Sequence, residues 1–567
     1  MDNLLNETKF EEHIASYLAD SDLYNQRSSA QFDIEKLCDV EMLEQFLRQQ
    51  PVVWNKLTKH FPSQEVATVI REYNKRIDRG ESILTIMRKG FTISGAKIKF
   101  CQFKPVLEGE GTDNYRLYRA NRFSVVRQMR YSLGKDSGNE LDLCILLNGI
   151  PLFTFELKNE GSDQNYTHGI LQYKRHRDPH NRMLRNCLVH FVMDNQYAFM
   201  TTFLNGEETT FLPFNQETVN PPIEGEYPTA YMWRRVLQAD SILDLLENFI
   251  KRYDEYYEDK DTKEQKKRTV VIFPRFHQLR AVRKLRGLIR EEGSGHNYLI
   301  QHSAGSGKTK TMAWLAHQLA NMTNPDGTAI FDSIIMVTDR IVLNRNMAED
   351  VVNFEVTAGT VKDIRKGSKK LADALNGENR IIISTVQKFA FALDYLKHEK
   401  SKKYAIIVDE AHTAIGNEAA KDLVSALSTK EDLEKMGDYD PDEYDSPLDA
   451  LMAQMQNYRK MMSHISYFAF TATPKDKTYA LYGKDGKSAH DLYSMKQAID
   501  EKFILDVTQN YVSYKTKFEL IEKHPDEDKD KLFEQKKALK VIGEWLGKNK
   551  YIKLRKASMI VDQFMKF

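Results

Sequence analysis

The segment 302–309, His-Ser-Ala-Gly-Ser-Gly-Lys-Thr, has residue types that bind the phosphates of a nucleotide. A glycine-rich turn lets successive backbone N–H groups approach phosphate oxygens, and a helix that begins there adds its partial positive charge. In this arrangement Lys308 reaches the β- and γ-phosphates of ATP, and the Thr309 hydroxyl binds Mg²⁺. The usual pattern G-x-x-x-x-G-K-[ST] has a glycine where this chain has His302. The turn itself consists of Gly305, Ser306 and Gly307.

A pair of acidic residues follows a second apolar run. Residues 405–408 (Ala-Ile-Ile-Val) predict a buried strand, and Asp409 and Glu410 come directly after it. At the carboxyl end of a parallel strand, Asp409 could hold Mg²⁺ and Glu410 could orient or deprotonate the attacking water. An acidic pair at such a place is, by itself, more often a helix cap or a solvated turn. The phosphate loop upstream in the same predicted domain favours the nucleotide site.

Farther upstream, Asp142 precedes the mostly apolar run 143–155, which Glu156, Leu157 and Lys158 follow. Two carboxylates can hold one or two divalent ions that polarise a scissile phosphate and generate hydroxide. A lysine beside them can orient the water or stabilise the charge of the transition state. The period of two in a strand places Glu156 and Lys158 on the same face. These residues therefore predict a metal-dependent nuclease site.

The turn between the two strands decides whether Asp142 can meet Glu156. A two-residue turn at 148–149 pairs strand positions so that the two carboxylates point to opposite faces. A three-residue loop at 148–150 pairs Asp142 with Glu156 on one face. We predict the three-residue loop or an equivalent bulge, and carboxylates on opposite faces would exclude the site.

A Glu–Lys pair two residues apart on a strand is, by itself, more often a surface pair than a nuclease site. Three features favour the nuclease hypothesis. Phe155 and Leu157 alternate with the charged pair, a basic stretch suited to phosphate contacts follows at 173–185, and Glu11 lies within the apolar stripe of a predicted helix. A merely solvating glutamate is not expected in such a stripe.

Two kinds of element must position these residues. Residues 90–215 are rich in short strand-like runs, and helical segments such as 7–18 flank them, which is typical of an α/β region with a small sheet. Beyond about residue 270, buried-strand runs alternate with amphipathic helices, which predicts a doubly wound parallel sheet. Charged stretches at 253–267 and 430–447 lack apolar periodicity, so we interpret them as a linker and an exposed insertion.

The composition is that of an ordinary globular protein of several domains, with 567 residues, 41% of them apolar and 29% charged. A net charge of +1 means that a nucleic-acid partner would need locally gathered basic residues. No signal peptide, no apolar run long enough to span a membrane and no fixed-period repeat is found, so we expect a soluble, cytoplasmic chain. Four cysteines without CxxC spacing indicate reduced thiols: Cys38, Cys101, Cys144 and Cys187.

Several further segments stand in a fixed order around the phosphate loop. Residues 275–278 (Arg-Phe-His-Gln) precede it, and 409–412 (Asp-Glu-Ala-His) and 470–474 (Phe-Thr-Ala-Thr-Pro) follow. In this order they resemble the superfamily-2 helicases and translocases of the DEAH-box type. The resemblance implies a first RecA-like motor domain over about 270–480, in which 337–340 and 384–387 grip the nucleic-acid backbone. It also implies roles for single residues. Gln278 would read the adenine base, His412 is the last residue of the DEAH motif, and Thr471 with Thr473 would belong to a motif that couples hydrolysis to DNA movement.

The arrangement of Asp142 with Glu156-x-Lys158 resembles the PD-(D/E)xK nuclease family. The resemblance implies that a glutamate on a helix completes the metal site, a role that we expect for Glu11. Gln172 is similar to the start of a Q-x-x-x-Y element found in related nucleases. This chain departs from that element, because His176 stands where the tyrosine is expected.

A nuclease domain followed in one chain by a DEAH-type motor resembles the restriction (R, motor and endonuclease) subunit of type I restriction–modification enzymes. Residues 148–152 (Asn-Gly-Ile-Pro-Leu) with 156–158, and residues 275–278, are similar to that family's segments. The resemblance implies ATP- and Mg²⁺-dependent translocation along double-stranded DNA, with cleavage of unmodified DNA remote from the recognition site. It also implies assembly with methyltransferase (M) and specificity (S) subunits, and no membrane.

We expect a nuclease-like domain at 1–255, a charged linker at 256–268, a first RecA-like domain at 269–515, and a helical connector with the first strand of a second such domain at 516–567. Superfamily-2 motors hydrolyse ATP between two RecA-like domains, and the Q-x-x-G-R-x-x-R motif of the second is not found. The isolated chain is therefore expected to bind ATP but to hydrolyse it poorly. Two alternatives stay open: an ATP- and DNA-binding assembly module deficient in hydrolysis, and a stand-alone superfamily-2 helicase–nuclease.

Overall fold

The computed structural model describes residues 7–106, 109–133, 139–159, 161, 164–258, 264–338, 341–354, 361–363, 368–377, 380–385, 402–409 and 464–506. Contacts within the chain define two compact units, Met1–Leu505 and Asp506–Phe567, and the elements below belong to the first. The elements predicted at 516–567 and the insertion predicted at 430–447 lie outside the described residues.

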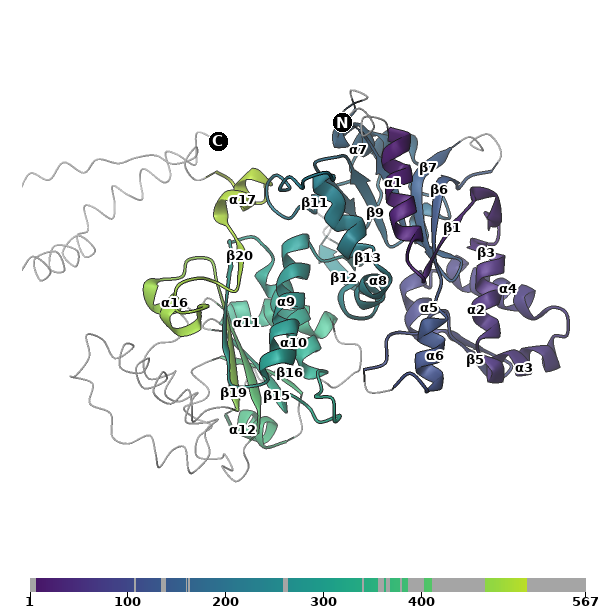
Figure 1. The fold of residues 1–567 in the computed structure, drawn as a ribbon. Coiled ribbons are helices and arrows are strands. Elements are labelled where there is room, and N and C mark those ends of the chain that lie inside the picture. The colour runs from purple at the N-terminus through teal and green to yellow at the C-terminus, as the bar shows by residue number, and fades with distance from the viewer. Residues whose placement is uncertain are drawn as a thin grey trace, which may run out of the picture. The chain divides into compact units, whose positions relative to one another are not determined.

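A mixed seven-stranded sheet organises the first part of the chain, and its strands follow the order β1-β6-β7-β8-β9-β10-β11 (Figure 1). The central strands β6 to β8 form an antiparallel meander, whereas β1 pairs with β6 and β9 pairs with β8 in parallel. The strand-like runs predicted near 141–158 and 188–203 are confirmed. The strands are β1 (Tyr24–Arg27), β6 (Phe123–Arg130), β7 (Glu140–Leu147), β8 (Ile150–Leu157), β9 (Val189–Met193), β10 (Ala198–Thr201) and β11 (Leu212–Pro213).

Helices accompany this sheet, and α1 (Glu7–Ala19) confirms the helix predicted over 7–18. Its buried residues Phe10, Ile14 and Leu18 recur at helical spacing, so burial of this stripe holds the helix on the sheet. α7 (Tyr166–His176) packs against β8 and β9. Between β1 and β6 lies a group of elements: β2 (Phe32–Asp33), β3 (Cys38–Asp39), α2 (Val40–Arg48), α3 (Pro51–His60), α4 (Glu65–Asp78), α5 (Ile83–Lys89), β4 (Phe91–Ile93), β5 (Ala96–Ile98) and α6 (Asp113–Arg119).

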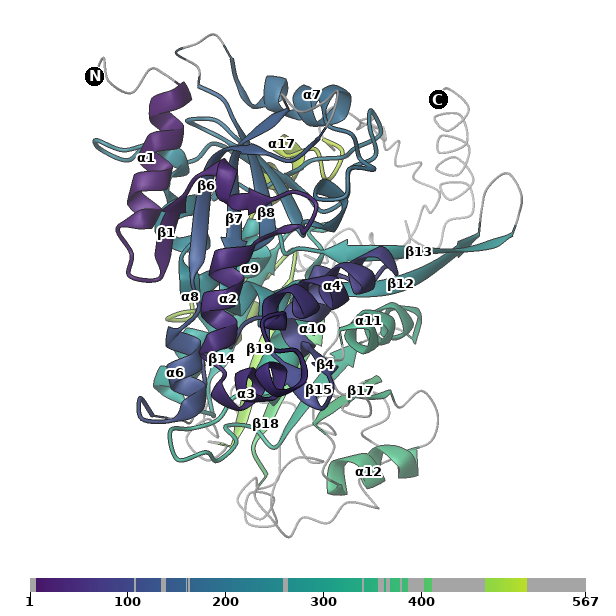
Figure 2. The same ribbon diagram turned by 90° about the vertical axis from the view of Figure 1, so that its right-hand side faces the viewer.

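The segment predicted as a charged linker is largely a β-hairpin. Two π-helices, η6 (Met232–Val236) and η7 (Leu245–Phe249), flank α8 (Ala239–Asp244), and then β12 (Lys251–Glu258) and β13 (Gln265–Ile272) pair antiparallel as an extended arm (Figure 2). The linker prediction for 256–268 is therefore wrong for the described residues. Its physical reason is charge pairing across the strands: Asp254 is 2.8 Å from the Lys267 ammonium and accepts a hydrogen bond from the Thr269 hydroxyl at 2.9 Å.

A second seven-stranded sheet follows, and all its strand pairs are parallel, in the order β16-β17-β15-β18-β19-β14-β20. Its strands are buried on both faces because helices connect them, which confirms the predicted doubly wound parallel sheet. The strands are β14 (Asn297–His302), β15 (Ser333–Thr338), β16 (Val361–Asp363), β17 (Ile381–Thr385), β18 (Tyr404–Asp409), β19 (Ile465–Thr471) and β20 (Asp491–Tyr493).

Helix α10 packs against β15, β17 and β18 and against α9 and α11, and α9 and α10 run alongside the parallel strands in Figure 1. Trp314 on α10 is fully buried, and its indole N–H donates to Phe249 O at the end of η7. The helices of this part are α9 (Phe276–Glu292), α10 (Lys308–Ala320), α11 (Ile341–Asn353), α12 (Ser368–Asn376), α16 (Asp476–Tyr482) and α17 (Met495–Asp500).

One continuous cluster of buried apolar side chains connects the elements of both sheets. Phe214, Phe273 and Phe276 form part of it, with ring centroids 5.6 to 5.7 Å apart for the pairs that include Phe214. The four cysteines are buried free thiols. Within the described parts of the chain, none of the helices combines the length and the apolar character needed to cross a bilayer.

Candidate functional site

The β7–β8 hairpin brings Asp142 and Glu156 into register. Asn148 and Gly149 both have positive φ and form a tight turn, so that Leu147 pairs with Ile150. The register then shifts by one residue, and Leu143 pairs with Phe155. Continuing this register by one position sets Asp142 opposite Glu156. The predicted loop or equivalent bulge is therefore present, as a two-residue turn followed by a bulge.

Glycine is required at position 149 for two reasons. Its φ is +83°, and a Cβ atom there would lie 2.3 Å from the carbonyl oxygen of Asp39. Asp39 N in turn donates to Gly149 O at 2.8 Å. The close approach of these two backbone segments fixes the turn, and hence the register that sets Asp142 opposite Glu156.

Asp142 and Lys158 are nearly buried neighbours at the end of the hairpin. Leu157 N donates to Asp142 Oδ2 at 2.6 Å, and Lys158 Nζ lies 3.5 Å from the same oxygen. Lys158 Nζ also donates to Leu157 O at 2.7 Å. Asp142 is 8% exposed and Lys158 5% exposed, so this ion pair is shielded from water far more than a surface pair. The predicted alternative of a solvated surface Glu–Lys pair does not fit this burial.

Glu156 is completely buried and is held by a residue that sequence reasoning assigned to the DNA phosphates. Arg177 Nε donates to Glu156 Oε1 at 2.7 Å, and Arg177 Nη2 donates to Glu140 O at 2.7 Å. Burial, followed by the nearby charge of Asp142, raises the pKa of Glu156 to about 8, although Arg177 opposes this shift. Within the described residues Glu156 Oε2 has no hydrogen-bond partner, so one lone-pair face is available to a cation.

Glu11 lies near this site but is connected to it through another residue. It is 3% exposed, its Oε1 accepts from Gln128 Nε2 at 2.8 Å, and its Oε2 lies 3.5 Å from Arg127 Nε. Gln128 lies in β6 and has a φ of +47°. Its two neighbours in β6 pair with the two β7 residues that flank Asp142, so Gln128 stands opposite Asp142. Among the described residues, no three His, Cys, Asp or Glu side chains lie close enough together to hold a metal. The role predicted for Glu11 stays a prediction.

Sequence reasoning missed Gln128 and Arg177 as members of this neighbourhood. A positive φ on a strand leaves no mark in the sequence when the residue is not glycine. Arg177 lies in the basic stretch at 173–185, and nothing in that run of basic residues marks the one that is buried. Tertiary packing brings Arg177 to Glu156 and Gln128 to Glu11.

Helix α7 packs closely on the strand that carries Glu156 and Lys158. A Cβ atom at Gly169 would lie 2.7 Å from a side-chain carbon of Val192, so only glycine permits this approach. Gln172 is half-buried on this helix and His176 is exposed. The basic stretch around this helix is largely used within the protein: Arg175 pairs with Glu207, Arg177 with Glu156, and Arg182 with Asp78. Because Arg177 is buried against Glu156, the expectation that it contacts DNA phosphates is wrong for this arginine, and for the exposed residues of the stretch it stays a prediction.

The phosphate loop lies between β14 and α10, as predicted. Gly305 and Gly307 have φ values of +70° and +80°, and α10 begins at Lys308 without a side-chain cap. The first N–H groups of α10 are therefore available to an anion. The hydroxyl of Ser306 is buried and, within the described residues, has no hydrogen-bond partner. Thr309 lies half-buried in the first turn of α10.

Gln278, predicted to read the adenine base, contacts the phosphate loop instead. Its Oε1 accepts from Arg275 N at 2.9 Å, and its Nε2 donates to Gly307 O at 3.1 Å. The neighbouring His277 lies 3.0 Å from Ser306 O through its Nε2. Both ends of the Gln278 amide are thus used inside the protein, and base reading by this residue stays a prediction.

The histidine that replaces the first glycine of the phosphate-loop pattern has its own structural role. His302 ends β14 with an ordinary negative φ, so no glycine is needed there. It is fully buried, and its Nε2 is 2.8 Å from Asp491 Oδ1, while Arg280 pairs with Asp491 at 2.8 Å. Burial opposes ionisation of Asp491, but the hydrogen bond from His302 and the charge of Arg280 lower its pKa to about 2. Through this contact with Asp491, His302 connects the phosphate loop to β20.

Asp409 ends β18, at the same edge of the sheet as the phosphate loop. β19 lies between β18 and β14, so Asp409 is two strands away from the loop strand and not on its direct neighbour. Asp409 is 9% exposed and pairs in register with Phe470. Thr471 and Thr473, predicted to couple hydrolysis to DNA movement, lie at the end of the adjacent strand β19, where Thr473 N donates to the Thr471 hydroxyl at 3.3 Å. The predicted residues Glu410 and His412 lie outside the described residues.

A pair of glycine substitutions tests the phosphate-loop geometry. In Gly307→Ala, the Cβ atom would lie 2.7 Å from Gln278 Nε2 at a residue with a φ of +80°, so we expect loss of ATP binding measured by fluorescent-nucleotide titration. Gly287 in α9 is the matched control, because a Cβ atom there meets no atom within 4 Å. Gly287→Ala should keep ATP binding and stabilise the chain by up to about 1 kcal/mol. Equal ATP binding by both variants would contradict the assigned loop geometry.

Comparison with known protein families supports the two-part organisation. A family model described as the N terminus of the type I restriction enzyme R protein matches residues 12–217, and a SWI2/SNF2 ATPase model matches residues 277–540. Endonuclease subunits of type I restriction enzymes match across both parts. The first part of the chain is thus similar to the R proteins of type I restriction enzymes. This agrees with the resemblance stated from the sequence, and the motor half is similar to SWI2/SNF2 ATPases.

The relatives are distant. The endonuclease subunit of the type I restriction enzyme SsaAORF53P from Staphylococcus saprophyticus is 21% identical over 414 residues, which cover 69% of this chain and 37% of that protein. The putative type I restriction enzyme MjaVIIP endonuclease subunit from Methanocaldococcus jannaschii is 24% identical over 307 residues, which cover 51% of this chain and 27% of that protein. The chain thus spans between about a quarter and little more than a third of the length of these relatives.

Two solved structures are also similar in part. The UvsW helicase from bacteriophage T4 covers 44% of this chain at 15% identity, with a TM-score of 0.25. A nuclease-deletion mutant of the type ISP restriction–modification enzyme LlaGI, in complex with a DNA substrate mimic, covers 41% at 16% identity, with a TM-score of 0.26.

Proposed function

We propose that this chain contributes the nuclease and part of the motor of a type I restriction enzyme, which cleaves unmodified double-stranded DNA after ATP-driven translocation. The observation that carries the proposal is the buried cluster of Asp142, Glu156 and Lys158 on one hairpin, upstream of a phosphate loop in the same chain. The two matching family models, one for the N terminus of the type I restriction enzyme R protein and one for SWI2/SNF2 ATPases, support it. Methyltransferase and specificity subunits are the proposed partners, and the cytoplasm is the proposed location.

The residues of the β7–β8 hairpin fit a divalent cation. Glu156 Oε2 is a buried oxygen without a hydrogen-bond partner in the described structure, and carboxylate oxygens are the ligands that Mg²⁺ prefers. Asp142 and Glu156 would hold Mg²⁺, which supplies Lewis-acid polarisation of the scissile phosphate and an activated water. Lys158, already beside Asp142, would orient the water or stabilise the negative charge that develops on the phosphate.

The phosphate loop fits a nucleoside triphosphate with Mg²⁺. The uncapped N-terminus of α10, the buried hydroxyl of Ser306 and the two left-handed glycines form a surface of hydrogen-bond donors. Lys308 would contact the β- and γ-phosphates, and Thr309 and Asp409 would hold Mg²⁺. Glu410 would orient or deprotonate the attacking water. These roles require the carboxyl ends of β14 and β18, which lie at the same edge of the parallel sheet.

The experiment that tests the proposal is cleavage of supercoiled circular DNA by the full chain, with Mg²⁺ or with EDTA and with or without ATP. We expect nicking that depends on Mg²⁺, and ATP binding by the same preparation. Nicking without any divalent ion, or no nicking under any condition including the presence of the partner subunits, would contradict the nuclease part of the proposal.

The nicking rate is expected to rise with pH. Burial and the charge of Asp142 raise the pKa of Glu156 to about 8, so below that pH the carboxyl group is largely protonated and lacks the charge that holds a divalent ion. Between about pH 6 and about pH 9 the rate should therefore increase, and higher Mg²⁺ should move the midpoint to lower pH because metal and proton compete. Initial rates at two Mg²⁺ concentrations measure this. A profile that is flat in pH would contradict it.

A further inference from the structure

Arg177 is buried against Glu156, and Arg175 and Arg182 pair with Glu207 and Asp78, so the basic stretch at 173–185 offers fewer free charges to DNA phosphates than the sequence suggested. A nuclease still needs a surface that neutralises the phosphates on either side of the scissile bond. Among the described residues, a different set of basic side chains lies on the solvent face of α4, within the same part of the chain as the hairpin site.

Arg71, Lys75 and Arg79 follow each other at intervals of four residues, so they form one row along α4 and its C-terminal end. All three are exposed. Within the described residues none of them forms an ion pair, and the guanidinium of Arg71 makes only a 3.4 Å contact with the Thr68 hydroxyl. Lys36 lies beside the row in the turn between β2 and β3, where Asn74 Nδ2 donates to Lys36 O at 3.2 Å, and its ammonium is 2.7 Å from Asp33.

The charge on α4 is sorted by face. Arg76, on the neighbouring face of the helix, is paired with both Glu72 and Glu81. Like charges four residues apart cost a helix about 0.2–0.5 kcal/mol for each pair. Asp78 is the acid beside this row, and Arg182 already pairs with it, so repulsion within the row is unfavourable for the isolated protein and an external anion would relieve it.

The row lines an open groove of about 660 Å³. Four basic side chains and a single acidic one, Asp78, line this groove, and Asp78 is already paired with Arg182 at 2.9 Å. Near the C-terminal end of α4, Arg252 Nη2 of β12 donates to Gly80 O at 3.3 Å, so a fifth exposed basic side chain lies beside the groove. The groove is thus strongly positive although the chain as a whole is nearly neutral.

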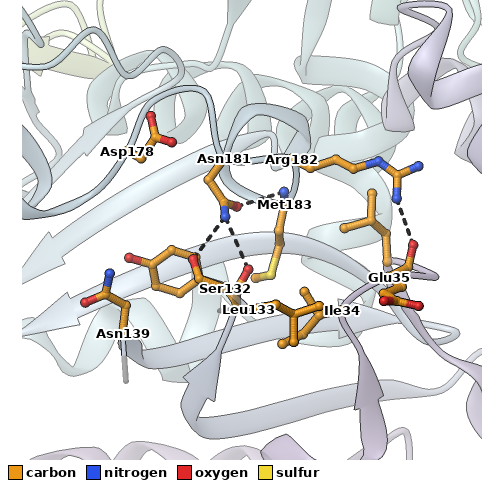
Figure 3. Close-up of a pocket in the computed structure, with 11 residues that line it drawn as sticks. Ile34, Glu35, Ser132, Leu133, Asn139, Asp178, Asn181, Arg182 and Met183 are labelled. Carbon is orange, nitrogen blue, oxygen red and sulfur yellow. Dashed lines mark hydrogen bonds between the residues drawn. The ribbon is translucent and has the colours of Figure 1, made fainter. Parts of the chain in front are cut away.

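Contacts connect this groove to the nuclease site. Arg182 donates to Asn74 in the groove and to Glu35 O. Arg182 and Glu35 also line an adjoining cavity of about 440 Å³ (Figure 3). Tyr131 lines the same cavity and lies 5.7 Å below the guanidinium of Arg177, which holds Glu156. The sequence of contacts therefore runs from α4 to the buried carboxylate.

We propose that this groove, formed by Lys36, Arg71, Lys75 and Arg79, binds the phosphate backbone of double-stranded DNA and leads it to the hairpin site. The inference rests on the proposed nuclease function. The adjoining cavity carries two carboxylates, Glu35 and Asp178, so the backbone runs along α4 and not through the cavity. Contacts to the backbone alone carry no sequence information, so binding in the groove is independent of sequence.

The test compares two triple variants of the full chain in binding a short duplex of mixed sequence at several salt concentrations. Arg71→Gln with Lys75→Gln and Arg79→Gln removes three charges from the groove and keeps helix propensity. The matched control removes three exposed charges that form no ion pair in the described structure, by Lys59→Gln, Arg119→Gln and Arg235→Gln. The groove variant should lower the slope of log K against log salt by about 2.7, which is about 0.9 for each lost phosphate contact. The control should keep the slope of the unmodified chain.

Nicking separates this inference from the proposed function. The groove variant should nick circular DNA more slowly than the control variant, with the deficit restored at low salt, and both should bind ATP equally. A groove variant that binds and nicks as the control does, while Asp142→Asn abolishes nicking, would overturn the groove alone. A chain that nicks DNA in no variant would overturn the proposed function, and the groove with it.

Discussion

Replacing Lys308 by alanine is expected to weaken ATP binding by about 10- to 100-fold, since a charge-assisted hydrogen bond to a phosphate contributes about 1.5–3 kcal/mol. Lys308 stands at the first position of α10, directly after the two left-handed glycines of the phosphate loop. Titration with a fluorescent ATP analogue measures the effect. Lys310→Ala is the matched control, because Lys310 lies one residue beyond Thr309 and pairs with Asp350 at 3.2 Å.

The control should bind ATP as the unmodified chain does, because a partly exposed pair such as Lys310–Asp350 contributes at most about 1 kcal/mol to stability. Nicking of circular DNA in the absence of ATP should be equal in both variants, since the hairpin site contains neither lysine. Undiminished ATP binding by Lys308→Ala would exclude the phosphate loop as the nucleotide site.

Asp142→Asn is expected to lower Mg²⁺-dependent nicking by more than about 100-fold. Loss of a residue that merely supports a metal ligand costs 10- to 100-fold, and Asp142 is proposed to be a ligand itself. The substitution keeps an oxygen that can accept the hydrogen bond from Leu157 N, so the hairpin should keep its register. Conversion of supercoiled to nicked circles over time measures the rate.

Glu140→Gln is the matched control for Asp142→Asn. Glu140 lies two residues earlier on the same strand, and its carboxylate pairs with Arg130 at 2.8 Å, whereas its backbone oxygen keeps the contact with Arg177. It should nick DNA as the unmodified chain does. Equal activity of Asp142→Asn and Glu140→Gln would contradict a metal-binding role for Asp142.

Local sequence signals were sufficient to predict two parts of the sites: the phosphate loop, which lies in one strand–loop–helix segment, and the carboxylate pair, which lies in one hairpin. The glycines and Lys308 stand between a buried strand and an amphipathic helix, and that order alone predicted the phosphate loop. The register of Asp142 with Glu156 followed from counting residues through the turn, because a strand has a period of two. The bulge that achieves it was one of the two solutions that counting allowed.

The rest depends on contacts between segments far apart in the chain. Arg177 was assigned to DNA, since a run of basic residues carries no sign of which member is buried against Glu156. The stretch around 253–267 was taken as a linker because its charges lack apolar periodicity, yet opposite charges face each other across two strands. His302 replaces a glycine because it bonds to Asp491, which lies 189 residues away. Pairing between distant segments leaves no local pattern.

Lys158→Ala provides the most direct test of the central claim, that the β7–β8 hairpin is a metal-dependent nuclease site. The variant keeps both carboxylates, so it should still bind Mn²⁺, measured by electron paramagnetic resonance without nucleotide. Its Mg²⁺-dependent nicking of circular DNA should fall by about 10²–10³-fold, the usual cost of losing one group that stabilises transition-state charge. Nicking at the rate of the unmodified chain would contradict the claim.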